Sequence, residues 1–226
     1  SFGYGETEVL HQISFSQPRN TLFALVGPSG GSKTTIANLL ARFWDVQKGS
    51  VLVRGVDVRR LPLGTLMDHI SMVFQNVYLF HDTVYNNIAM GRPDASREEV
   101  IEAAKQARCY DFIMALPDGF DTMVGEGGAN LSGGERQRIS IARCILKDAP
   151  IVILDEATAN VDADNESYIQ EAISSLCRGK TLLVIAHRLN TIFQADRILV
   201  VERGAIVQAG RHEELAAQEG VYRRFV

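Results

Sequence analysis

A glycine-rich loop between an apolar run and a helical pattern constrains the fold of this chain most strongly. The apolar run, residues 22–26, contains no polar residue and has the length of a buried strand, whereas the apolar spacing of residues 36–43 predicts a helix. Between them lies the segment GPSGGSKTT, residues 27–35. A strand, a glycine loop and a helix in this order are typical of α/β folds that bind phosphate at a helix N-terminus. We therefore expect an α/β core built around this loop.

The composition of the loop predicts a triphosphate site of the P-loop kind. Backbone N–H groups at a helix N-terminus hold concentrated negative charge, and small residues let the backbone approach it closely. In this interpretation Lys33 reaches the outer phosphates and the hydroxyl of Thr34 is a ligand of Mg²⁺. The residues expected to hold the nucleotide here are Gly27, Pro28, Ser29, Gly30, Gly31, Ser32, Lys33, Thr34 and Thr35.

Two residues of the loop stand in an unusual order. The usual P-loop has glycine immediately before the lysine, whereas here Ser32 stands there and Gly31 lies one place earlier. A Cβ at residue 32 would crowd the approach of the backbone to the phosphate. If the position also requires a left-handed backbone, the strain is about 1–2 kcal/mol. We therefore expect a site that binds the nucleotide weakly, not one that is dead.

Charge and apolar patterning exclude several classes of protein. The net charge of −4 and the pI near 5.8 give no electrostatic footprint for nucleic acid, so we expect no nucleic-acid partner. Apolar runs such as residues 182–186 are far shorter than the roughly 20 residues that a membrane helix needs. The cysteines lie too far apart in the sequence for a close metal or redox pair, so reduced thiols are expected.

The patterning predicts one domain, residues 1–226, made of two parts. Residues 1–75 and 149–226 are expected to form an α/β core with an antiparallel N-terminal β portion. Residues 76–148 are expected to form an inserted α-helical lobe. The lobe has clear helical signals, because Ser96 is a good N-cap and Glu98 and Glu99 follow it in the first turn.

Two further motifs carry chemistry. Asp155 and Glu156 follow the apolar run 151–154, which places them at the C-terminal end of a buried strand, where α/β sheets bind ligands. The alternative is an acidic pair in a surface turn, and the P-loop more than a hundred residues upstream favours the functional interpretation. The octet LSGGERQR, residues 131–138, opens a helix with a serine and two glycines, which predicts a second anion site at Ser132, Gly133 and Gly134. The alternative there is a capped helix with a Gly-Gly hinge.

This octet resembles the signature sequence of ATP-binding cassette (ABC) ATPases, and the resemblance extends nearly from end to end of the chain. It implies that Tyr4 stacks on adenine, that Gln75 lies between core and lobe, and that His187 contacts the γ-phosphate. Residues 157–162 resemble the loop that crosses the dimer interface, with Ala159 where serine is frequent. Residues 78–88 and 116–128 resemble exporter-type domains.

The resemblance implies a fold and a function. The fold is a P-loop NTPase (RecA-like) core, and the function is that of a nucleotide-binding domain that powers an exporter-type ABC membrane transporter by ATP-driven dimerisation. The implied cofactors are ATP and Mg²⁺. The catalytic residues would be Glu156, His187 and Lys33, and the metal ligands would be Thr34, Gln75 and Asp155.

The resemblance also implies partners and a location. Transmembrane domains, fused upstream, would bind the domain at the cytoplasmic face of a membrane. A second nucleotide-binding domain, in a homodimer or a heterodimer, would sandwich two ATP molecules head to tail. Each ATP would then touch Lys33 of one subunit and Ser132 and Gly134 of the other.

Two alternatives belong to other classes. One is a soluble ABC ATPase of DNA repair or translation, against which stand the acidic pI and the short helical lobe without coiled-coil heptads. The other is a nucleotide-binding but catalytically weak regulatory subunit, which the position of Ser32 keeps open.

Overall fold

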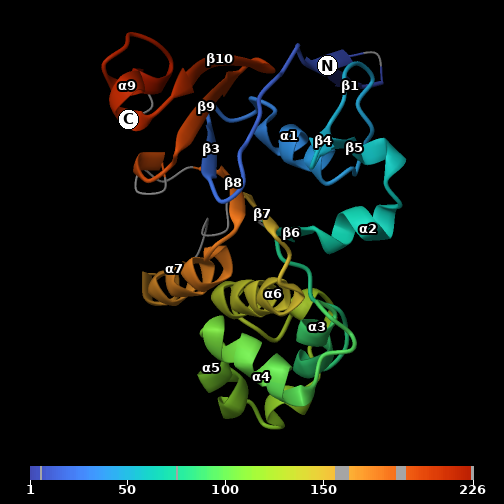
Figure 1. The fold of residues 1–226 in the computed structure, drawn as a ribbon. Coiled ribbons are helices and arrows are strands. Elements are labelled where there is room, and N and C mark those ends of the chain that lie inside the picture. Colours follow the sequence, from blue (N-terminus) through green and yellow to red (C-terminus); the bar gives the residue numbers. More distant parts are fainter. Residues whose placement is uncertain (6, 75, 156–162, 187–191, 225–226) are drawn as a thin grey trace. The chain divides into compact units, whose positions relative to one another are not determined.

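The computed structural model describes residues 1–5, 7–74, 76–155, 163–186 and 192–224. The chain divides into two compact units. The first, which we call the α/β unit, consists of residues 1–70, 151–156 and 180–226. The second, the helical unit, consists of residues 71–150 and 157–179. Figure 1 labels the elements of both. Within the described residues, no helix is both long enough and apolar enough to cross a membrane.

A mostly parallel sheet forms the centre of the α/β unit. Its strand order is β10-β9-β3-β8-β7, followed by β6, the strand through which the chain leaves this unit. Strand β3 is parallel to both neighbours, β8 is parallel to β7, and β10 is antiparallel to β9. The bounds are β3 (Leu22–Val26), β6 (Ile70–Val73), β7 (Ile151–Asp155), β8 (Thr181–Ile185), β9 (Arg197–Glu202) and β10 (Ala205–Gly210).

The parallel strands are buried because they are apolar along nearly their whole length. In β3 and β7, every residue after the first is buried, as expected of strands covered on both faces. The helix α1 (Lys33–Leu40) packs against β7 and β8 and buries Ile36, Ala37 and Leu39. The predicted strand, loop and helix therefore form the start of the core.

The helix after the loop ends earlier than its apolar spacing predicts. We expected helix over residues 36–43, whereas α1 ends at Leu40, with Ala41 as its C-cap. Arg42 takes a left-handed backbone, with φ of 57°, and the N–H of Phe43 donates to the carbonyl oxygen of Asn38 at 2.9 Å. This hydrogen bond from beyond the cap stops the helix. It turns Phe43 and Trp44 out of the helix, where both are about half exposed.

Short antiparallel ribbons complete the α/β unit, as predicted for its N-terminal part. In the first ribbon β1 (Phe2–Tyr4) pairs with β2 (Thr7–Leu10), and in the second β4 (Leu52–Val53) pairs with β5 (Val56–Asp57). The remaining elements of the unit are η1 (Val58–Arg60), α2 (Leu63–Asp68), α9 (His212–Ala216) and η4 (Tyr222–Arg224).

Helix α6 (Gly133–Lys147) organises the helical unit. It packs against α3 (Val84–Ala89), α4 (Arg97–Gln106) and α7 (Ala163–Cys177), and Figure 1 shows α3, α4 and α5 gathered beside it. The other elements are α5 (Tyr110–Ala115), η2 (Gly119–Asp121) and η3 (Glu126–Gly128). Both α4 and α6 begin with a capping box, from Ser96 to Glu99 and from Ser132 to Glu135, which is the start that their sequences predict.

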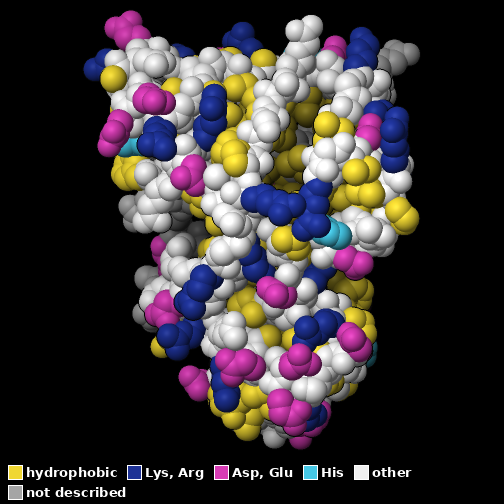
Figure 2. All heavy atoms as spheres, in the orientation of Figure 1, with side chains coloured by type: hydrophobic (Ala, Val, Ile, Leu, Met, Phe, Trp, Pro, Cys, Tyr) yellow, Lys and Arg dark blue, Asp and Glu magenta, His cyan; other side chains and the backbone are white. Residues whose placement is uncertain are grey.

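Two further features of the helical unit bear on the sequence predictions. On the face that Figure 2 shows, acidic and basic side chains are interspersed over this unit, so neither sign of charge dominates there.

Burial raises the pKa of Cys109 to about 12, so this cysteine stays an unreactive thiol, as expected.

The predicted division into core and lobe differs in one respect from the two compact units. The sequence division assigned all residues from 149 onward to the core, whereas the compact units place residues 157–179, with α7, in the helical unit. The physical reason is that α7 packs along α6. The description of residues 76–148 as an inserted lobe stays a prediction.

The close approach of Gly91 to α6 generates a test of packing. A Cβ built on Gly91 would stand 2.2 Å from the carbonyl oxygen of Arg143, a backbone atom that cannot give way locally. We expect Gly91→Ala to lower the free energy of unfolding by about 1–3 kcal/mol through overpacking. The matched control is Gly64→Ala in α2, where nothing lies within 4 Å and alanine should stabilise the helix by about 0.5–1 kcal/mol.

Chemical unfolding of the two variants and the parent gives the comparison. Opposite signs for the two glycines are expected. A Gly91→Ala variant as stable as the parent would show that Gly91 does not approach α6 as closely as described.

Candidate functional site

The loop after β3 curls around its own lysine. The side chain of Lys33, the first residue of α1, is buried, and its Nζ donates hydrogen bonds to the carbonyl oxygens of Gly27 and Pro28, both at 2.9 Å. Gly27 must be glycine, because its φ is 144° and a Cβ would stand 2.0 Å from the carbonyl oxygen of Val201. The ammonium group is therefore held inside a ring of backbone, where a phosphate at the helix N-terminus could meet it.

Ser32 has a left-handed backbone conformation, in which a non-glycine residue is strained. The unusual residue order puts serine at this position in place of glycine. As the N-cap of α1 it has φ of 66° and ψ of 21°, and its side chain makes no capping hydrogen bond. This conformation costs a non-glycine residue about 1–2 kcal/mol. Gly31 has no positive φ, and a Cβ there would be tight but not impossible, at 3.0 Å from the carbonyl oxygen of Pro28 and 3.1 Å from that of Val201. The inversion thus places the side chain at the position that needs glycine more.

Tyr4 reaches the first turn of α1 from the N-terminal ribbon. Its hydroxyl lies 3.4 Å from Oγ1 of Thr35, and its ring is 45% exposed. Edge contacts hold the ring in place, with centroid distances of 5.0 Å to Phe2 and 5.6 Å to Trp44. The structure therefore brings an accessible aromatic ring beside the phosphate loop, which is the arrangement that stacking on a base requires.

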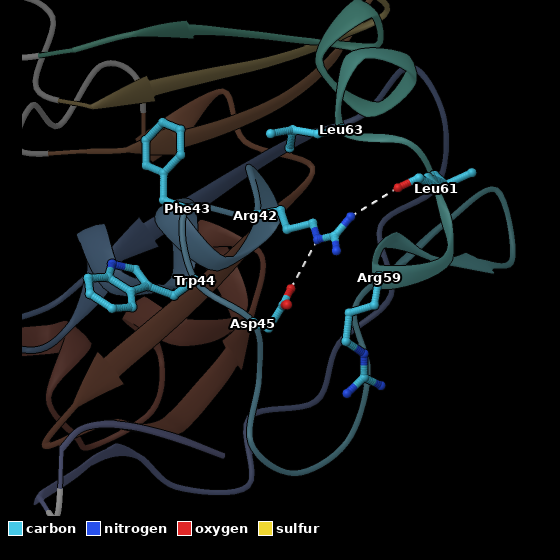
Figure 3. Close-up of a pocket in the computed structure, with 7 residues that line it drawn as sticks. All are labelled: Arg42, Phe43, Trp44, Asp45, Arg59, Leu61 and Leu63. Atoms are coloured by element: carbon cyan, nitrogen blue, oxygen red, sulfur yellow. Dashed lines mark hydrogen bonds and ion pairs between the residues drawn. The ribbon is translucent and has the colours of Figure 1, made fainter.

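Trp44 also lines a pocket of about 450 Å³ (Figure 3). Arg42 holds the segments around it, because its Nε donates to Oδ1 of Asp45 at 3.0 Å and its Nη1 donates to the carbonyl oxygen of Leu61 at 3.0 Å. Sequence analysis missed this pocket, since helical spacing assigned Phe43 to the end of a helix. Its lining residues are Arg42, Phe43, Trp44, Asp45, Arg59, Leu61 and Leu63.

Asp155 ends β7 at the same edge of the sheet as the loop. In the parallel register Leu25 of β3 pairs with Ile185 of β8, which in turn pairs with Asp155 of β7. The chain leaves β3 into the loop two residues after Leu25, so the loop and the Asp155 carboxylate share the C-terminal edge of the sheet. This is the edge at which open α/β sheets bind their ligands.

The oxygen atoms at this edge suit Mg²⁺. The hydroxyl of Thr34 is on an exposed side chain, and the carboxylate of Asp155 is buried. Hydroxyl and carboxylate oxygens are the ligands that Mg²⁺ takes beside a nucleotide phosphate. Gln75, Glu156 and His187, predicted for metal or catalytic roles, lie outside the described residues.

The second predicted anion site is at the start of α6, in the helical unit. The Oγ of Ser132 accepts the N–H of Glu135 at 3.2 Å, and the N–H of Ser132 donates to Oε2 of Glu135 at 2.8 Å. Ser132 and Gly133 are exposed, and a Cβ on Gly133 would meet nothing within 4 Å. The helix is therefore capped, as the alternative interpretation predicts. The N-terminus of this fifteen-residue helix is also open, so the anion site stays a prediction.

Comparison with known proteins supports the resemblance. The family model described as ABC transporter matches residues 10–159. An ATP-dependent lipid A-core flippase of Desulfotalea psychrophila is 51% identical over 98% of this chain and 39% of its own length. The putative multidrug export ATP-binding/permease protein YgaD of Bacillus subtilis is 48% identical over 99% of this chain and 39% of its own length.

A solved structure agrees with the fold. A bacterial Atm1-family ABC exporter with ATP bound matches with a TM-score of 0.92 and 44% identity, over 99% of this chain and 39% of that one. The chain thus spans about two fifths of the length of these relatives. The predicted fold class is confirmed. The chain belongs to the ABC transporter family.

Proposed function

We propose that this domain binds ATP with Mg²⁺ and hydrolyses it, as part of a longer protein that exports a substrate across a membrane. The observation that carries the proposal is the buried Lys33 ammonium inside the loop, with the exposed ring of Tyr4 on one side and Asp155 on the same sheet edge. The names of the relatives, a flippase and an export protein, support the coupling to transport.

The described residues provide binding and orientation. The ring of Tyr4 stacks on the adenine, the N–H groups of the loop receive the phosphates, and Lys33 holds the outer ones. Thr34 and Asp155, together with Gln75 from outside the described residues, would hold Mg²⁺, which neutralises phosphate charge when it is bound. Because phosphoryl transfer needs mainly positioning and electrostatic stabilisation, this rigid loop does most of what the reaction requires.

Two residues outside the described part complete the proposed chemistry. Glu156 orients and polarises the attacking water, and His187 contacts the γ-phosphate. Both follow parallel strands, Glu156 directly after β7 and His187 two residues after the end of β8, so their chain positions lead to the edge where Asp155 lies.

The partners are a second nucleotide-binding domain and transmembrane domains of the same transporter. A second domain, identical or homologous, would bring its Ser132 and Gly134 to the ATP held by Lys33 of this one. The relatives are about two and a half times longer than this chain, which supports transmembrane domains fused upstream and a place at the cytoplasmic face. The exposed side chains of Phe43, Trp44 and Leu63 offer the transmembrane domains an apolar surface.

A catalytically weak regulatory subunit is the second candidate. The observation in its favour is Ser32 in the left-handed conformation, at the place where the backbone meets the phosphate. The predictions for Glu156 and Ser32 separate the two candidates.

We predict that Glu156→Gln keeps ATP affinity but lowers the rate of hydrolysis by at least about 100-fold. The amide preserves the shape of the side chain and removes the charge that polarises the water. Phosphate release and ATP titration of parent and variant provide the measurement. A variant that turns over like the parent contradicts the role of Glu156, and a parent without turnover supports the regulatory candidate instead.

We predict that Ser32→Gly tightens ATP binding by roughly 5- to 30-fold. The side chain at a left-handed position lowers the population of the binding-competent loop, and removing a strain of about 1–2 kcal/mol restores it. The double change Gly31→Ser with Ser32→Gly should gain less, because the new Cβ at residue 31 is tight against two carbonyl oxygens.

Ser32→Ala is the matched control, since it keeps the Cβ and loses only the hydroxyl. Its affinity should equal that of the parent. Equal ATP affinity of Ser32→Gly and the parent, at the same Mg²⁺ and salt, would show that the inverted order is harmless.

We predict that Tyr4→Ala weakens ATP binding by about 1–3 kcal/mol, whereas Tyr4→Trp keeps most of the affinity. The difference arises because a base stacks on either aromatic ring but not on a methyl group. ATP titration of both variants checks the prediction. Equal losses would indicate that Tyr4 acts only through its contacts with Phe2 and Trp44.

A further inference from the structure

Arg138, the last residue of the signature octet 131–138, has a buried and highly hydrogen-bonded side chain in the first half of α6. It is only 7% exposed, and it donates to three acceptors within the helical unit. Nε donates to the carbonyl oxygen of Gly134 at 3.4 Å, Nη1 to that of Arg108 at 2.9 Å, and Nη2 to Oδ1 of Asn165 at 2.8 Å. A planar guanidinium spreads five N–H donors over three nitrogen atoms in a fixed fork, whereas a lysine has three donors on a single nitrogen.

Arg138 contacts two residues on one face of the first turns of α7. Its guanidinium carbon lies 5.2 Å from the ring centroid of Tyr168, and Asn165 precedes Tyr168 by three residues, one helical turn. The ring of Phe112 lies 4.9 Å from the same carbon. The cation thus lies over two aromatic rings, which together with its hydrogen bonds restrict its orientation.

Gly134 brings the two helix starts into direct contact. A Cβ on Gly134 would stand 2.6 Å from Cβ of Asn165, so the backbone of α6 touches the Asn165 side chain. Gly134, Asn165 and Arg138 therefore form a closed set of contacts, which we call the Arg138 clasp. The clasp sets the position of the α7 start relative to the α6 start.

The two starts that the clasp joins have functional neighbours in the sequence. Ser132 and Gly133 immediately precede Gly134 and form the proposed anion site. Residues 156–162, which contain Glu156 and the segment resembling the dimer-crossing loop, lead directly into α7 at Ala163. In the proposed function, the Ser132 end of α6 meets the ATP that the partner domain binds.

We propose that Arg138 is a positioning residue, acting through Asn165, that holds residues 132–134 in a preset conformation for the ATP bound by the partner domain. This inference rests on the proposed function. The clasp does not touch the loop around Lys33, which belongs to the α/β unit. Loss of the clasp therefore changes catalysis by the assembled dimer and leaves ATP binding by one domain intact.

Asn165→Ala is the variant that tests the clasp. It keeps the Cβ that packs on Gly134 and removes the acceptor of the Arg138 hydrogen bond. We expect kcat for ATP hydrolysis to fall about 10-fold, since hydrogen bonds to charged groups are among the stronger ones. KM for ATP and the affinity of a single domain for ATP should stay within about twofold. Asn165→Asp restores an acceptor for Nη2 and should recover most of the rate.

Glu171→Gln is the matched control. Glu171 also ties α7 to the helical unit, through an exposed ion pair with Arg108 at 2.6 Å, but it lies six residues beyond Asn165 and outside the clasp. This variant should keep the parent kcat. Thermal unfolding of all variants, measured alongside, shows whether a loss of rate follows a loss of stability.

The outcomes are distinct. The inference is overturned if Asn165→Ala keeps the parent kcat, if Asn165→Asp loses as much as Asn165→Ala, or if Glu171→Gln loses as much. A rise in KM at unchanged kcat also overturns it, because that result points to the loop of the α/β unit. A parent protein without ATP turnover overturns the proposed function itself, and with it this inference. A fall in kcat for Asn165→Ala that Asn165→Asp largely recovers and Glu171→Gln does not show supports it.

Discussion

The hydrogen bonds from Lys33 to the carbonyl oxygens of Gly27 and Pro28 are the interaction on which the rest of the α/β unit depends. A buried ammonium group is costly unless it is hydrogen-bonded, so the loop must curl to supply acceptors. That curl requires glycine at residue 27, against the backbone of Val201 in β9. The strand order places β3 between β9 and β8, so the loop follows a central strand and lies at the middle of the sheet edge.

Arginine side chains play the corresponding part in the helical unit, where backbone carbonyl groups at helix ends and in the adjoining loops need donors. Arg136 donates to the carbonyl oxygens of Gly128 and Leu131, and Arg143 donates to that of Asn87. With Arg138, three arginines on α6 thus reach in three directions, toward the segment before the signature, toward α3 and toward α7. Burial lowers the pKa of Arg143, but its pKa starts so high that the group stays charged. One helix can therefore fix most of this unit.

Local pattern was enough to predict what depends on neighbours in sequence. The apolar run before Gly27, the capping boxes at Ser96 and Ser132, and Asp155 at a strand end all lie where the sequence places them. Contacts between distant segments were not predictable in this way. The Arg138–Asn165 bond depends on the register of α7 against α6, and the early end of α1 depends on the left-handed backbone of Arg42. Apolar spacing carries no information on either, since both depend on tertiary contacts and backbone conformation.

Ser32 shows how a domain can retain a locally unfavourable residue at its most demanding site. The strain of about 1–2 kcal/mol is small beside the 5–15 kcal/mol by which folded domains are usually stable, so the fold itself can carry it. The same strain is not small beside a nucleotide-binding free energy, in which about 1.4 kcal/mol is a tenfold change. Because the hydrogen bonds of Lys33 and the close contact at Gly27 fix the loop on both sides, residue 32 cannot relax to an ordinary conformation without breaking one of them. The strain therefore changes the nucleotide affinity by a large factor while it lowers the stability of the fold only slightly.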